Sequence, residues 1–128
     1  MFSWYKGKTP IQKELPATAA VAYKLGDALA YGADGTVVKA TGTTKPEFIC
    51  ASKDFTAVAG DMVVGQVIEE DMEFKTTFSA AATSIKLGNK VTIGTNGDTV
   101  TATTSGGVAE VIEMAGTASG SECIVKLK

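Results

Sequence analysis

The residues best able to do chemistry form an acidic run, VIEEDMEF, that holds Glu69, Glu70, Asp71 and Glu73. Grouped carboxylates of this kind can hold a hard cation such as Ca²⁺. Their spacing follows no known calcium-loop pattern, and on a strand neighbouring side chains would point to opposite faces. We therefore predict a solvated acidic edge that discourages unwanted strand pairing, and no metal site.

Two glycine-rich stretches, GADG (32–35) and GTNGD (94–98), could in principle cradle a phosphate. A phosphate cradle needs a helix N-terminus after the loop and usually a lysine. Both stretches instead run into Val- and Thr-rich sequence typical of strands. Asp34-Gly35 and Asn96-Gly97 are typical of tight hairpin turns, in which glycine supplies a positive φ.

The chain has no histidine, and all 12 of its basic residues are lysine. Without histidine it lacks the side chain that titrates near neutrality and the commonest metal ligand, and no nucleophile–base pair suggests itself. Without arginine it lacks the planar fork suited to phosphates and base edges. A net charge of −2 also repels polyanions. The composition predicts a non-enzymatic protein with no cofactor and no nucleic-acid partner.

The two cysteines, Cys50 and Cys123, lie in apolar runs, which predicts buried free thiols. A disulfide between them stays open, because sequence does not give their separation. No apolar run reaches the roughly 18 residues of a membrane span. The start MFSWYKGK lacks a signal-peptide h-region, so we expect no membrane association and no export.

The segment LGDALAYGADGTVVKAT (25–41) recurs as LGNKVTIGTNGDTVTAT (87–103), and each copy predicts a strand, a turn and a strand. We expect modules at about 25–73 and 87–128, joined by 74–86, with at most a turn or two of helix. The predicted fold is all-β, a small barrel or sandwich formed by one domain, 18–128. Biotinyl and lipoyl carrier domains are also pseudo-symmetric, and they present a lysine at the tip of a hairpin. Here Lys39 lies beyond its turn and not at the tip, so we do not predict a carrier domain.

Residues 1–17 show no periodicity, and Pro10 and Pro16 favour extended backbone. Residues 1–24 carry a net charge of +3, whereas the remainder carries −5. One interpretation is a frayed terminus. The other is an extended N-terminal arm that docks on a partner through its aromatic and basic side chains, which are Phe2, Trp4, Tyr5, Lys6 and Lys8.

Residues 23–74, with LGDALAYGADGTVVKATGTTKPEFICAS and VAGDMVVGQVIEEDMEF, resemble the capsid decoration (head cement) proteins of tailed phages. The resemblance implies a virion protein, made in the host cytoplasm, that binds the major capsid protein on the outer capsid surface and stabilises the head. By analogy with lambda-type decoration proteins, it implies an arm that adds to the lattice and a homotrimer. The alternatives are a tail or spike accessory domain of a phage, or a generic β binding module.

Overall fold

The computed structural model describes all 128 residues and contains strands but no helix. The strands are β1 (Ser3–Lys6), β2 (Gln12–Pro16), β3 (Ala22–Tyr23), β4 (Ala28–Tyr31), β5 (Val37–Lys39), β6 (Phe48–Cys50), β7 (Phe55–Thr56), β8 (Met62–Val67), β9 (Glu73–Thr77), β10 (Lys90–Val91), β11 (Ala109–Met114) and β12 (Glu122–Lys126). The all-β prediction is confirmed, and the absence of helix lies within the expected limit of a turn or two. No helix of the chain could cross a bilayer.

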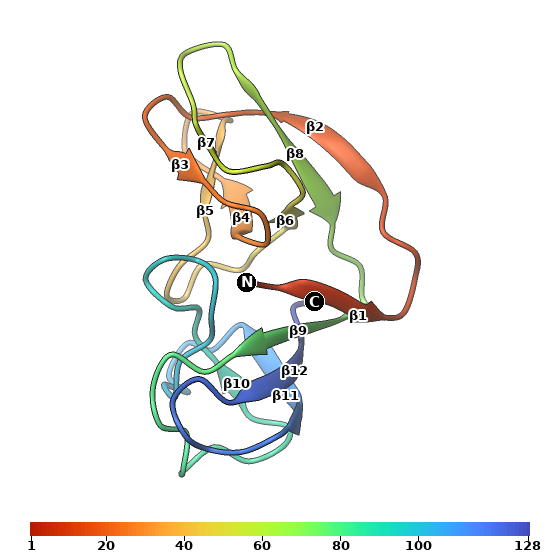
Figure 1. Cartoon of the computed structure of the whole chain (residues 1–128), viewed down its shortest axis with the longest axis vertical. Helices are drawn as coiled ribbons and strands as arrows, with labels where there is room; N and C mark the ends of the chain where they lie inside the picture. Colours follow the sequence, from red (N-terminus) through yellow and green to blue (C-terminus); the bar gives the residue numbers. More distant parts are fainter.

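The strands form two five-stranded antiparallel sheets and one small ribbon. The first sheet has the order β2-β8-β6-β4-β5, the second has the order β1-β9-β12-β11-β10, and β3 pairs with β7. Figure 1 shows the first sheet in one lobe and the second sheet in the other, with β1 between them. Neither sheet closes on itself, so of the two predicted architectures the structure is the sandwich-like one and not a barrel.

Two apolar clusters cover both faces of the central strands of the first sheet. The larger holds 19 buried residues from both sheets, including Ile49 of β6 and Phe74 of β9. The smaller holds 9 residues, including Phe48 of β6 and Tyr23 of β3. Because neighbouring strand residues point to opposite faces, Phe48 and Ile49 bury themselves in different clusters. The first sheet is thereby packed between the second sheet and the β3–β7 ribbon.

The two predicted turns are present and differ in length, but only the first is flanked by paired strands, β4 and β5. In the second copy the predicted strand pair is reduced to a single bridge between Ile93 and Val100. Gly35 has φ +83° and Gly97 has φ +76°, as the turn prediction required. The Gly32 amide donates to Thr36 O (2.7 Å), whereas the Gly94 amide donates to Thr99 O (2.8 Å), one residue further along. The sequence match of Val38 with Val100 is therefore shifted by one residue in the structure. Val37 forms a parallel bridge with Ala17, and Val100 forms a parallel bridge with Phe78. Val37, and not Val38, is therefore the counterpart of Val100 in the structure.

Other hydrogen bonds recur at corresponding places in the two halves. The Lys24 amide donates to the Asp27 carboxylate (2.9 Å), and the Lys86 amide donates to the Asn89 side-chain carbonyl (2.9 Å). Strands β2-β8-β6-β4 and β9-β12-β11-β10 are also laid down in the same chain order within their sheets.

Residues 1–17 lie within the sheets. β1 pairs with β9, and β2 pairs with β8, so this segment forms an edge strand of each sheet. Phe2 is 1% exposed and belongs to the larger cluster, while Leu15 is buried in the smaller one. The expected connection at 74–86 likewise begins inside β9. A projecting N-terminal arm is not seen, and its predicted contact residues are divided among several surroundings.

Candidate partner-binding face

The five predicted contact residues do not form one patch. Phe2 is buried, Trp4 is 39% exposed and Tyr5 is 44% exposed. Trp4 lines a shallow cavity of about 280 Å³ between the lobes, together with Leu25 and Gln66. Tyr5 lies instead on the outer face of the second sheet. Alternation along β1 separates the two rings, because successive side chains of a strand point to opposite faces.

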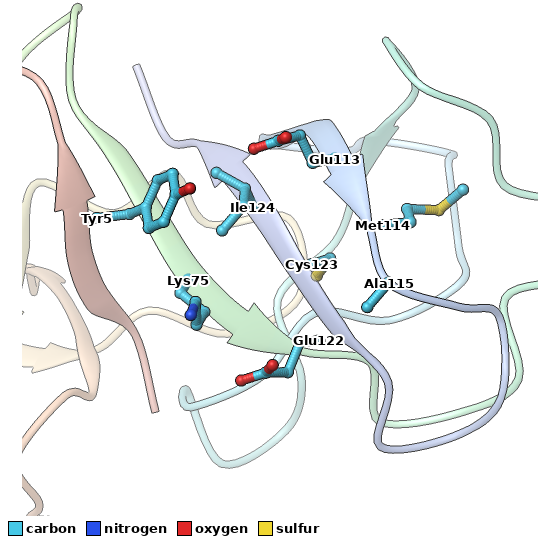
Figure 2. Close-up of a pocket in the computed structure, with 8 residues that line it drawn as sticks. All are labelled: Tyr5, Lys75, Glu113, Met114, Ala115, Glu122, Cys123 and Ile124. Carbon is cyan, nitrogen blue, oxygen red and sulfur yellow. The ribbon is translucent and has the colours of Figure 1, made fainter.

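Tyr5 forms one wall of a pocket of about 260 Å³ on that outer face. Figure 2 shows Ile124 of β12 beside the Tyr5 ring, with Lys75 of β9 below them. The Lys75 ammonium lies 5.6 Å from the centre of the Tyr5 ring, which is within the range of a cation–π interaction. Glu113 and Glu122 also line this pocket. The pocket thus combines an apolar floor with charged side chains, a composition suited to binding a protein surface.

A row of alternating charges crosses the second sheet on the same face. On neighbouring strands Lys90 lies opposite Glu110, and Glu110 lies opposite Lys126. At the other end of the row Lys6 lies opposite Glu73. The pairing of Val125 with Phe74 sets Lys126 beside Glu73 and so completes the row. Cross-strand pairs of opposite charge stabilise a sheet by about 0.2–1 kcal/mol each. The row also gives a partner a pattern that can fix orientation and register.

Lys8 makes an ion pair inside the molecule. Its ammonium lies 2.7 Å from a Glu69 carboxylate oxygen, and this hydrogen bond raises the pKa of Lys8. The Trp4 indole N–H donates to Lys8 O (3.1 Å), which holds the same loop. Gly7 packs against the backbone of Asp71 so closely that a Cβ there would clash. These contacts tie the β1–β2 loop to the β8–β9 connection, where the chain crosses between the lobes.

The acidic run and the cysteines offer no reactive site. No group of three or more carboxylate and thiol side chains is placed to hold a metal ion. Cys50 and Cys123 are free and buried, which confirms the thiol prediction. Burial raises the pKa of Cys123 to about 12, so this thiol stays protonated at neutral pH and is a poor nucleophile.

Sequence reasoning missed most of this face. It named Tyr5 and Lys6, but not Lys75, Glu113 or Ile124, which come from three other strands. No sequence signal distinguishes Ile124, because it lies in an unbroken apolar run with Cys123 and Val125.

The geometry defines an all-β, two-lobed, sandwich-like fold (Figure 1), which was compared with known proteins. No family model matches the chain, and no curated protein matches its sequence significantly. Among solved structures, the N base of head fiber gp8.5 of bacteriophage phi29 superposes with a TM-score of 0.57 at 21% sequence identity. The match covers 92% of this chain and 97% of that one. Such a likeness shows a shared fold.

Proposed function

We propose that this chain is a structural protein of a phage virion, bound to the major capsid protein on the outer capsid surface, and that it stabilises the shell. The observation that carries the proposal is the shared fold with a phage head fiber base along nearly the full length of both chains. The resemblance of residues 23–74 to capsid decoration proteins is the reason for proposing attachment to the outer capsid surface.

The outer face of the second sheet is the contact surface that we favour. Tyr5 and the Lys6 end of the charge row lie there, and Tyr5 is exposed enough to lose substantial area on contact. Burying an aromatic side chain contributes roughly 1.5–3 kcal/mol, reduced here because half of the ring is already covered. Trp4 adds a second exposed ring in the cavity between the lobes. Phe2 acts differently, since its burial anchors β1 to the body.

Modest contacts suffice for such a protein. Many copies on one lattice bind it with avidity whenever the copies are themselves linked, so each face need contribute little. The charge row then serves mainly to select the docking orientation, because exposed ion pairs are individually weak.

The test uses particles of the virus that encodes the chain, purified without it. Tagged protein is added, the particles are sedimented, and the bound fraction is measured. We expect saturable binding that Tyr5→Ala and Lys6→Glu each weaken at least tenfold. Val58→Ala and Lys53→Glu are matched controls, because both residues are exposed away from this face.

Two outcomes would contradict the proposal in different ways. Binding that is indifferent to Tyr5 and Lys6 but lost in Trp4→Ala would move the contact to the cavity between the lobes. No binding to heads, together with binding to isolated tails, would favour the tail or spike alternative.

A further inference from the structure

The two sheets share a strand order, but only one of them has a further strand beyond the shared ones at this edge. In the second sheet β9 lies between β1 and β12, whereas in the first sheet the corresponding strand, β2, pairs with β8 alone. Figure 1 shows β2 along the margin of its lobe. The first sheet therefore has a free edge at the place where β1 completes the second sheet.

The strands β2 and β9 correspond residue by residue. The Ala17 amide, directly after β2, donates to Asp61 O (2.9 Å). The Phe78 amide, directly after β9, donates to Ser121 O (3.0 Å). Residues at equal distances before Ala17 and Phe78 are therefore counterparts, and what β1 does at β9 can be transferred to β2.

The backbone of β2 presents unpaired groups at Gln12 and Glu14. Hydrogen bonds in an antiparallel ladder alternate between the two sides of a strand. The Ala17 amide and the Ile11 carbonyl both bond on the β8 side, each at 2.9 Å. The amides and carbonyls of Gln12 and Glu14 consequently point away from β8. The counterpart of Glu14 is Lys75, which lies opposite a residue of β1.

The side chain at the start of this edge is exposed, whereas its counterpart is buried. Ile11 directly precedes β2 and is 57% exposed, while Met72 directly precedes β9 and is 1% exposed. In the second half Gly7, just after β1, packs closely against the Met72 backbone. A strand on the β2 edge would cover Ile11 in the same way, and burial of an aliphatic side chain favours such a contact.

The charges of β2 determine which strand this edge can accept. Lys13 takes the place of Phe74, while the next side chain, Glu14, points to the opposite face. An incoming strand should place an acidic residue opposite Lys13 and a basic residue opposite Glu14, because like charges directly opposite are destabilising. Two copies of β2 fail this requirement. In the two registers that pair Gln12 and Glu14 within the strand, either two Lys13 or two Glu14 side chains lie opposite each other, so the charges favour a strand of a different protein.

We propose that the free edge of β2 binds an extended segment of the major capsid protein, which adds antiparallel to β2 as β1 adds to β9. The inference rests on the proposed function and gives it a second contact, on the sheet that does not carry Tyr5. Backbone hydrogen bonds to Gln12 and Glu14 provide affinity, and the charges of Lys13 and Glu14 select the segment. Pro16 has no amide to donate and so ends the paired stretch.

Hydrogen exchange of the full chain, free and bound to virus particles purified without it, tests the inference. The exchange is read residue by residue by mass spectrometry after quenching. In the free protein the amides of Gln12 and Glu14 should exchange fast and those of Lys13 and Leu15 slowly, because only the latter two face β8. On particles the amides of Gln12 and Glu14 should become protected.

Proline substitutions test the same two amides by binding. Glu14→Pro removes only an outward amide and should weaken particle binding about tenfold, because a buried capsid carbonyl then loses its donor. Glu14→Ala is the matched control, since it removes the same side chain but keeps the amide, and its loss should be clearly smaller. Gln12→Pro repeats the test at the other outward amide. Circular dichroism checks that each variant is folded, and exchange in the wild type decides the matter if the proline variants unfold.

The outcomes separate this inference from the proposed function. Bound chain in which the Gln12 and Glu14 amides still exchange fast would overturn the inference alone, as would binding that a folded Glu14→Pro variant leaves unchanged. Protection that appears in the free protein as its concentration rises would assign the edge to a second copy and also overturn the inference. No binding to heads would overturn the proposed function, and this inference with it.

Discussion

The Asp27 carboxylate lies 3.2 Å from the Lys39 ammonium, with the Asp27 side chain 1% exposed and that of Lys39 24% exposed. Asp27 also accepts the Lys24 amide at the turn into β4. In the second half Asn89 makes the same turn contact without a charge. The first half therefore keeps a buried carboxylate whose one ionic partner is a lysine from β5.

Lys39→Ala should destabilise the protein by about 3 kcal/mol, at the low end for a broken buried pair because Lys39 is partly exposed. Removing the lysine leaves the Asp27 charge buried without a counter-ion. Asp27→Asn combined with Lys39→Met should recover most of the loss, since asparagine can still accept the Lys24 amide. Urea denaturation measures both. Equal stability of the single and double variants would mean that the uncompensated Asp27 charge is not the cause of the loss.

Gly35→Val should lower stability by roughly 1–3 kcal/mol, because a β-branched residue is strained at φ +83°. Gly97→Val should cost more. It carries the same strain and brings a Cβ within 3.3 Å of the Lys39 Cβ and 3.4 Å of Ala40 O. Thermal unfolding of the two variants gives the order, and an equal or reversed order would contradict the packing of the second turn.

Removing residues 1–17 should unfold the protein, because it deletes an edge strand from each sheet and three core side chains, Phe2, Leu15 and Ala17. Phe2→Ala alone should cost about 3–5 kcal/mol, as truncating a buried phenylalanine leaves a cavity. Trp4→Ala is the control, since Trp4 is 39% exposed and should matter far less. A truncated protein that keeps its circular dichroism spectrum and its cooperative melting would support the sequence-based interpretation of residues 1–17 as an arm separate from the β domain.

The Cys123 thiol should make stability fall at high pH. Its pKa is raised to about 12 by burial, while an unfolded thiol ionises near its ordinary value of about 8.5. The folded state therefore holds the proton more tightly, and this contribution is complete below the unfolded pKa and lost as pH rises toward 12. Denaturation between pH 8 and 10 should show a steeper decline in the wild type than in Cys123→Ala. Matching slopes would contradict the burial effect.

Local chemistry made several features of this chain readable in advance. Asp34-Gly35 and Asn96-Gly97 predict turns because only a few residue types tolerate positive φ, and that constraint acts within four residues. The thiols were placed correctly because each lies in a short apolar run that had to be buried. The strand content followed from Val, Thr and Ile runs broken by glycine, which is again a short-range signal.

The fate of residues 1–17 depended on partners distant in the sequence. β1 and β2 have mostly exposed side chains, so neither shows the alternation that marks a strand. They are strands because β9 and β8 present free edges in a matching register, and a register between distant segments leaves no local trace. The candidate face has the same origin: Tyr5, Lys75, Ile124 and Glu113 meet only when four strands align. The burial of the second turn has the same origin, because Gly97 O accepts its hydrogen bond from the Ala28 amide, a residue distant in the sequence.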